Sequence, residues 1–113
     1  MKLRVVIFMF FFSMVGFSQG ETSNWYFGNG AGLRFNTDGT VSSLADGKMN
    51  TFEGGATISN ANGELLFYTD GITVYDKDHE VMQNGNDLYG NPSSTQSAII
   101  VPKPGNLDIY YIF

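Results

Sequence analysis

The chain has 113 residues, and its 6 Lys and Arg against 11 Asp and Glu give a formal net charge of -5. This length allows one domain at most and is too short for barrel enzymes and large α/β folds. The sequence has no cysteine, which excludes disulfides, thiolate zinc sites, iron–sulfur clusters and cysteine nucleophiles. Basic residues do not cluster after the first four positions, so the composition also argues against a nucleic-acid-binding surface.

Residues 1–18 have the pattern of a signal peptide. Lys2 and Arg4 precede a nearly unbroken apolar run over residues 5–17, and small residues lead to a cleavage site after Ser18. As a helix this run would reach only about 20 Å, which is short of the roughly 30 Å hydrocarbon core of a bilayer. We therefore expect export, removal of the signal and no membrane span afterwards. The alternative is an N-terminal core strand or a retained anchor.

The remaining 95 residues are acidic and rich in turn-forming residues. They carry 4 cations and 11 carboxylates, a net charge of -7, and Gly, Asn and Asp make up 30 of them. Such a composition favours strands and turns over helices. No segment after the signal shows a convincing 3.6-residue apolar period. The fold class that we predict is therefore all-β.

The first predicted hairpin lies in an N-terminal hairpin region, residues 19–54. Two short strands, residues 32–37 and 40–44, are joined at Asp38-Gly39. Because Asp-Gly readily takes the positive φ angles of a type I′ turn, the sequence predicts a two-residue turn here.

A second group of strands is predicted in residues 55–83. The connections are so short that only antiparallel neighbours are possible, which predicts a meander. A long Gly-, Asn- and Ser-rich loop, residues 84–96, would lead from this group to the next strands. The four strands expected in sequential order are residues 56–59, 64–69, 72–76 and 80–83, with an Asp70-Gly71 turn between the second and third.

Two strands are apolar on both faces. In residues 64–69, Leu and Phe on one face alternate with Leu and Tyr on the other, and residues 108–113 are apolar on both faces after the first position. A β-propeller packs each blade between two others, whereas a two-layer sandwich wets one face of each sheet. The pattern favours antiparallel, propeller-like blades. It also predicts an exposed apolar face on residues 108–113, and marginal stability or aggregation, where further blades are missing.

An internal repeat supports this interpretation. Propeller repeats are about 40 to 50 residues long, and we predict one full blade with its connecting loop in residues 55–96. Residues 97–113 would begin a second, truncated blade, paired as a separate hairpin and packed on the first, in a fragment of a larger propeller. An offset of 42 residues aligns Ala56 with Ala98, Ile58 with Ile100, Gly63 with Gly105, Leu65 with Leu107 and Tyr68 with Tyr110.

The order of motifs resembles a known family. The chain is similar to the N-terminal, β-propeller-like region of large secreted Bacteroidetes proteins that are labelled as gliding-motility-associated or as carrying a type B sorting domain of the type IX secretion system. In that family adhesion-type β-sandwich modules commonly follow, and the family assigns no catalytic residues to these positions. The segments that carry the resemblance are residues 24–35 (NWYFGNGAGLRF), 53–59 (EGGATIS), 63–75 (GELLFYTDGITVY) and 90–102 (GNPSSTQSAIIVP).

Two groups of residues are candidates for binding an ion or a phosphate. Glycines alternate over residues 28–32, but a strand pattern follows them and no helix, so a loop is expected and not a phosphate site. Five carboxylates could supply oxygen ligands to Ca²⁺, but their spacing fits no known calcium loop. We therefore expect solvated turn carboxylates that Ca²⁺ does not stabilise. These are Asp70, Asp76, Asp78, Glu80 and Asp87.

Two further groups are candidates for catalysis or sugar binding. His79 is the single histidine, and a catalytic triad would have to combine it with a serine at position 93, 94 or 97, which nothing in the sequence places beside it. Trp25, Tyr26 and Phe27 could stack on a sugar ring, but consecutive residues of a strand alternate faces, so at least one is expected in the core. We assign no catalytic, cofactor-binding or metal-binding residue from the sequence.

Two classes of function remain open. The first is a non-enzymatic, propeller-like domain of a secreted or cell-surface protein, in adhesion or scaffolding, with an extracellular protein or polysaccharide and the rest of the full-length protein as partners. The second is the N-terminal part of a secreted propeller hydrolase acting on polysaccharide, whose catalytic carboxylates would come from several blades.

Overall fold

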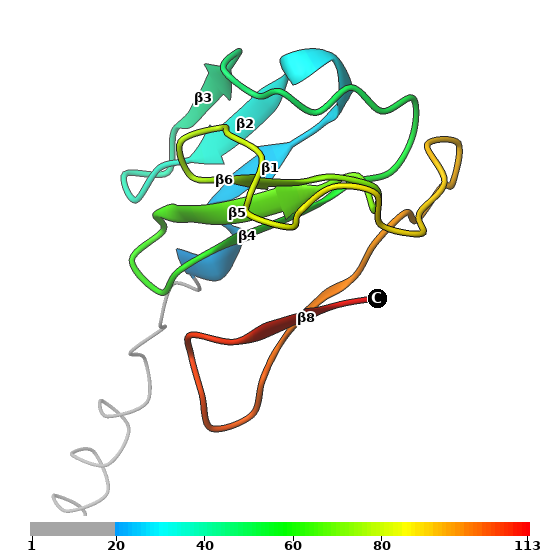
Figure 1. The fold of residues 1–113 in the computed structure, drawn as a ribbon. Coiled ribbons are helices and arrows are strands. Elements are labelled where there is room, and N and C mark those ends of the chain that lie inside the picture. The colour runs from blue at the N-terminus through cyan, green and yellow to red at the C-terminus, as the bar shows by residue number, and fades with distance from the viewer. Residues whose placement is uncertain (1–19) are drawn as a thin grey trace, which may run out of the picture.

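A computed structural model describes residues 20–113, which form three small antiparallel sheets and contain no α-helix (Figure 1). This confirms the all-β prediction, whereas the predicted signal peptide lies outside the described residues. Within them, no helix is long and apolar enough to span a membrane. The elements are η2 (Gly20–Thr22), β1 (Asn24–Tyr26), η3 (Gly28–Gly30), β2 (Gly32–Phe35), β3 (Val41–Leu44), β4 (Ala56–Ser59), β5 (Leu65–Thr69), β6 (Val74–Asp76), β7 (Ile100–Pro102) and β8 (Tyr110–Ile112).

The first sheet has the order β1-β2-β3. Its β2–β3 pair is the first predicted hairpin, with the aromatic Phe35 opposite the β-branched Val41. β1 pairs with the other edge of β2. Because successive side chains of a strand point to opposite faces, Tyr26 lies in the core and is 5% exposed, whereas Trp25 lies on the outer face and is 48% exposed.

The second sheet has the order β4-β5-β6 and confirms three of the four strands predicted for the meander. The fourth predicted strand, residues 80–83, is present only as a short antiparallel contact with β6. Val81 forms one isolated bridge with Tyr75, flanked by hydrogen bonds from the Asp76 N–H to the Glu80 carbonyl at 2.8 Å and from the Met82 N–H to the Val74 carbonyl at 2.9 Å. The chain then turns, and the Val74 N–H bonds to the Gly85 carbonyl at 2.6 Å, so the pairing with β6 ends at residue 82.

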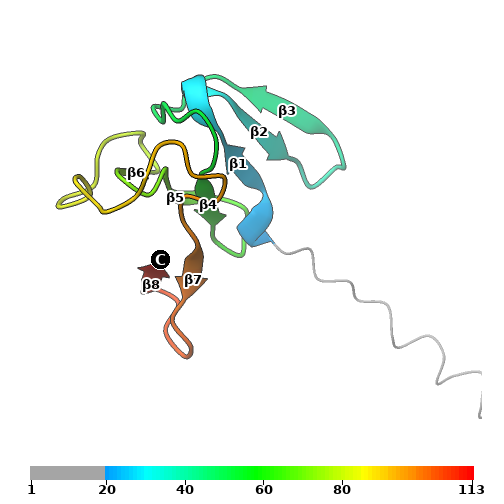
Figure 2. The same cartoon turned by 90° about the vertical axis from the view of Figure 1, so that its right-hand side faces the viewer.

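The third sheet is the β7–β8 hairpin, which is separate from the second sheet as predicted. Ile99 and Phe113 extend it by exchanging two backbone hydrogen bonds of 2.9 and 3.0 Å. Figure 2 shows the hairpin beside the second sheet, and the Tyr110 ring meets the Phe67 ring edge-on at a centroid distance of 5.5 Å. In the described part of the chain the three sheets close neither a barrel nor a propeller.

The core lies between the first and second sheets. The Tyr26 and Tyr68 rings stack at 4.6 Å with an interplanar angle of 17°, and Tyr75 stacks on the other side of Tyr68 at 5.2 Å. Met49, from the loop after β3, is fully buried against them. Phe67 is buried on the opposite face of β5, so both faces of this strand are covered, as its sequence pattern predicts.

The predicted two-residue type I′ turns are wrong. A type I′ turn needs positive φ at both central residues, but in the Asp38-Gly39 and Asp70-Gly71 pairs only the glycine has it. The first hairpin instead turns through three residues, because the Gly39 N–H donates to the Asn36 carbonyl at 3.0 Å and the Asn36 N–H to the Thr40 carbonyl at 2.8 Å. Four residues, 70–73, connect β5 to β6.

Candidate functional site

A groove of about 710 Å³ lies between the second sheet and the β7–β8 hairpin. This volume is in the range of small-ligand pockets. Its apolar wall combines the buried Phe67 and Val74 of the second sheet with Leu88, and Tyr110 and Ile112 of β8 face them across the groove. Ile112 and Tyr110 belong to one face of β8, because residues two apart on a strand point the same way.

The loop of residues 82–90 forms one side of the groove and is fixed to the second sheet by its backbone. The Leu88 N–H donates to the Ile72 carbonyl and the Gly90 N–H to the Gly71 carbonyl, both at 2.9 Å. A Cβ atom at Gly90 would collide with the Gly71 carbonyl, and one at Gly71 would collide with the carbonyl of Ser97. These close approaches need glycine, so tight backbone packing fixes this part of the groove wall.

The polar part of the groove contains an unsatisfied hydroxyl. Ser97 Oγ is buried and has no hydrogen-bond partner among the described residues, although buried polar atoms are normally paired. Asn84 and Asp108 also line the groove. Of the lining residues, Asp108 is the one with a formal charge, and no Lys or Arg is among them. The groove therefore offers an apolar wall together with hydrogen-bonding groups and one carboxylate.

A second polar cluster joins the first and second sheets around His79. The His79 Nδ1 atom is 3.1 Å from the Tyr68 hydroxyl, and its Nε2 atom is 3.3 Å from Asp46 Oδ2. The Tyr26 hydroxyl donates to Asp46 Oδ1 at 2.9 Å, and the Lys48 N–H donates to the Tyr68 hydroxyl at 3.0 Å. Asp46 and Tyr26 come from the first sheet and its following loop, so the cluster ties that region to the second sheet.

Burial and hydrogen bonding shift two pKa values in this cluster. Burial raises the pKa of Tyr26 well above its ordinary value, and the hydrogen bond to Asp46 raises it further. Burial alone would raise the pKa of Asp46. The hydrogen bond from Tyr26 and the nearby His79 act in the opposite direction, and the net effect is a lowered pKa. These shifts favour the neutral form of the Tyr26 phenol and the ionised form of the Asp46 carboxyl group.

The structure does not assemble a serine hydrolase around His79. Of the three candidate serines, Ser94 donates its hydroxyl to the Gln96 carbonyl at 3.1 Å, and Ser97 lies in the groove. Within residues 20–113, the hydrogen-bond and ion-pair partners of the His79 ring are Tyr68 and Asp46. The imidazole therefore has a contact with a carboxylate but none with a nucleophile.

The candidate calcium ligands are spread along the turns. Asp70 is buried, so the prediction of a solvated carboxylate is wrong for this residue, because its Oδ1 accepts the N–H groups of Ile72 and Thr73 at 2.9 and 2.7 Å within the turn. Asp76 Oδ1 accepts two backbone N–H groups of its own turn in the same way. In the part of the chain that the structure describes, no three His, Asp or Glu side chains come together as a metal site.

The glycine-rich and aromatic motifs belong to the first sheet. Residues 28–30 form a tight turn between β1 and β2 in which Asn29 and Gly30 have positive φ, 58° and 71°, in agreement with the predicted loop. The Gly30 N–H donates to the Met49 carbonyl at 3.1 Å. Of the three consecutive aromatics, Tyr26 is the core residue. The Trp25 ring lies on the outer face, with the Phe35 ring 5.5 Å away and the Phe27 ring 6.5 Å away.

Two features were not identified from the sequence, namely the groove and the Asp46–His79 contact. Both combine residues from segments that are far apart in the chain, and no local pattern marks such pairs. The high glycine content near residues 85–90 is a weak signal of close backbone packing.

Comparison with protein-family models, curated proteins and solved structures gives no match to this chain.

Proposed function

We propose that this chain is a non-enzymatic binding domain of an exported protein, in adhesion or scaffolding at the cell surface or outside the cell. The groove beside the β7–β8 hairpin carries this proposal, because it combines an apolar wall with polar groups that include the Asp108 carboxylate. A ligand with an apolar face and a polar group would cover this wall and bond to those groups. Glycoside hydrolysis generally needs two carboxyl groups across the scissile bond, whereas one carboxylate, that of Asp108, lines the groove.

We further propose that the second sheet acts as a propeller-like blade. Its central strand buries Phe67 on one face and Tyr68 on the other, as in a sheet packed between two neighbours. The resemblance to secreted Bacteroidetes proteins and the signal-like residues 1–18 support export. Mass spectrometry of the exported chain should find Gln19 at the N-terminus, and retention of residues 1–18 would contradict export.

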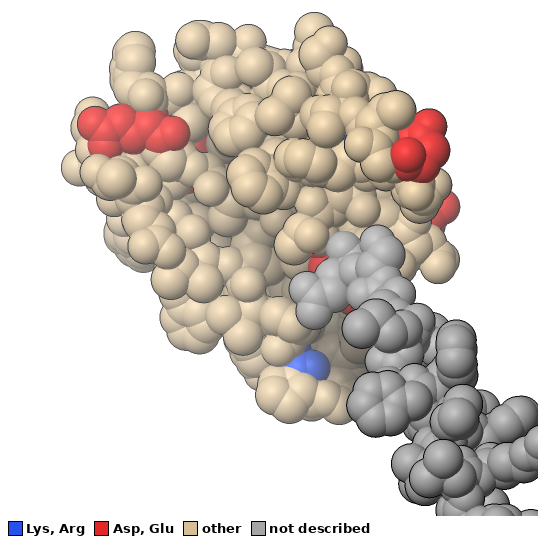
Figure 3. Space-filling model, turned by 180° about the vertical axis from the view of Figure 1, so that it is seen from behind, with Lys and Arg blue, Asp and Glu red and all other residues tan. Residues whose placement is uncertain are grey.

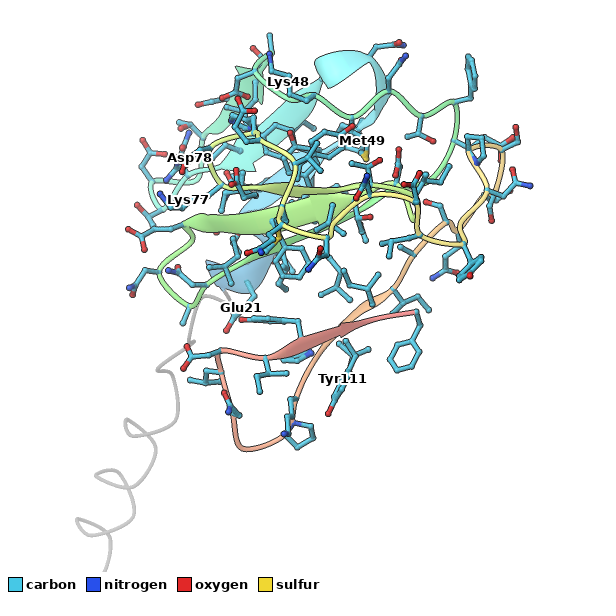
Figure 4. The ribbon with its side chains drawn as sticks, viewed as in Figure 1. Glu21, Lys48, Met49, Lys77, Asp78 and Tyr111 are labelled. Carbon is cyan, nitrogen blue, oxygen red and sulfur yellow. The ribbon has the colours of Figure 1, made fainter. Side chains whose placement is uncertain are left out.

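Two neighbouring tyrosines provide the test of the binding role. Tyr110 lines the groove, whereas Tyr111 is 43% exposed on the other face of β8 and points away from the second sheet (Figure 4). We expect Tyr110→Ala to reduce binding of the labelled chain to the surface or extracellular matrix of the producing cells, and Tyr111→Ala to leave it unchanged. Equal binding by both variants would contradict a role for the groove, and release of sugar from that matrix would favour the hydrolase.

A further inference from the structure

The groove has the charge and the aromatic surface that suit a cation. Asp108 is its one formal charge, and neither of the two ion pairs within residues 20–113 involves this carboxylate. The Asp108 N–H is held by Asn106 Oδ1 at 2.9 Å, which fixes the backbone without neutralising the side chain. A positively charged group in the groove would meet an unpaired carboxylate and no competing Lys or Arg.

Aromatic side chains line the same groove as this carboxylate. Tyr110 follows Asp108 by two residues, and both line the groove, as does Tyr89, which is 107% exposed. Aromatic faces attract cations, most strongly the planar guanidinium of arginine, which stacks on a ring while it pairs with a carboxylate.

The charge of the whole domain acts in the same direction. Residues 20–113 contain 4 Lys and Arg against 11 Asp and Glu, and Figure 3 shows acidic surface at several points of one face and little basic surface. A field of this sign raises the local concentration of cationic partners and opposes a second copy of this acidic chain.

We infer that the groove binds an arginine side chain of a partner protein, with the guanidinium on Asp108 and on the aromatic ring of Tyr110. This inference names the ligand chemistry of the groove and therefore rests on the proposed binding function. The remaining length of the groove would hold the residues on either side of that arginine in the partner.

The test uses two blocked tripeptides, Ala-Arg-Ala and Ala-citrulline-Ala, which differ in charge and hardly in shape. Binding to the exported chain is followed by the shifts of its backbone amide NMR signals. We expect the arginine peptide to bind, with a Kd about fivefold lower than that of the citrulline peptide, and added salt to reduce this difference. The perturbed signals should be those of residues 82–90 and 108–113.

Two carboxylate variants make the test specific. Asp108→Asn should remove the fivefold preference for arginine, and it should fold, because the carboxylate has no partner in the structure. Asp78→Asn is the matched control, since Asp78 lies outside the groove and pairs with Lys77 at 3.4 Å. Equal affinity for the two peptides, or a preference that survives in Asp108→Asn, would overturn the inference.

A neutral sugar distinguishes this inference from the proposed function. If a methyl glycoside binds in the groove, loses affinity in Tyr110→Ala and outcompetes the arginine peptide, the binding role stands and the arginine inference fails. If neither peptide nor glycoside binds and Tyr110→Ala leaves binding to the producing cells unchanged, the proposed function fails as well.

Discussion

Two turns of the second sheet have the same backbone but differ at one decisive residue. In the turn between β4 and β5, the Asn60 N–H donates to the Glu64 carbonyl and the Gly63 N–H to the Asn60 carbonyl, both at 2.9 Å. In the turn after β6, the Asp76 N–H donates to the Glu80 carbonyl at 2.8 Å and the His79 N–H to the Asp76 carbonyl at 3.1 Å. Each turn also begins with a side-chain oxygen that accepts two backbone N–H groups.

The fourth residue of each turn has positive φ. Gly63 takes φ 80° without strain, whereas His79 takes φ 65°, a region that costs a residue with a Cβ about 1 kcal/mol or more. His79 contacts Tyr68 and Asp46, and the Gly63 position has no side chain to do so. The comparison suggests that contacts between the two sheets offset the backbone strain at His79, and the following variants test this.

The largest effect is expected from Gly63→Ala. An alanine there would have to keep positive φ, and its Cβ atom would lie 2.9 Å from Ser23 Oγ. The Gly63 carbonyl also accepts a buried hydrogen bond from Asn24 Nδ2 at 2.9 Å, which a shift of the backbone would weaken. We expect a loss of about 2 kcal/mol in the free energy of unfolding, measured by urea denaturation.

A matched control separates backbone strain from the steric clash. Gly39 has nearly the same φ, 84°, but a Cβ there would have no atom within 4 Å. Gly39→Ala should therefore cost only about 1 kcal/mol. If the two variants lose the same stability, the contact with Ser23 is not important.

Local pairing in this chain could be predicted from the sequence because hairpins combine residues that are close in the chain. The β2–β3 and β4–β5 pairs follow from alternating apolar residues and from turn residues between them. The early end of the fourth predicted strand could not be predicted. Residues 80–82 do lie along β6, but the Val74 N–H bonds to the Gly85 carbonyl and not to Met82, and only the tertiary structure shows this.

The internal repeat shows a second limit of sequence analysis. Ile58 pairs with Phe67, nine residues later, whereas Ile100 pairs with Ile112, twelve residues later. The second hairpin is thus three residues longer, so a constant offset of 42 that aligns β4 with β7 cannot also align β5 with β8. The identity of Tyr68 and Tyr110 in that alignment therefore does not place them at equivalent positions, and the groove that Tyr110 lines could not be foreseen from it.

A smaller effect is expected at alkaline pH. Burial and the hydrogen bond to Asp46 raise the pKa of Tyr26, so the neutral phenol stabilises the folded state. This contribution is fully present below the ordinary tyrosine pKa of about 10 and is lost as the pH rises through the higher pKa of the folded state. Unfolding curves between pH 8 and 12 should show a shallower alkaline decline for Tyr26→Phe than for the unmodified chain, and parallel curves would contradict this.

At acid pH the contribution of Asp46 should disappear. The pKa of Asp46 is lowered in the folded state, so its stabilising effect is present above the ordinary aspartate pKa of about 4 and is lost as the pH falls through the lower folded value. Asp46 is 56% exposed, so solvent screens the effect and we expect it to be modest. Asp46→Asn should lower the urea midpoint at pH 7, and the difference from the unmodified chain should shrink as the pH falls below the ordinary aspartate pKa of about 4.

The smallest effect is expected from His79→Gly, because two changes oppose each other there. Glycine removes the strain of positive φ but also the contacts with Tyr68 and Asp46, so the stability should change by less than about 0.5 kcal/mol. His79→Ala loses the same contacts and keeps the strain, so it should be about 1 kcal/mol less stable than His79→Gly. Urea denaturation of the two variants at pH 7 measures this difference directly. A large loss of stability in His79→Gly would mean that the histidine contacts stabilise the junction of the two sheets by much more than the backbone strain costs. Equal stability of the glycine and alanine variants would mean that the turn after β6 is not strained.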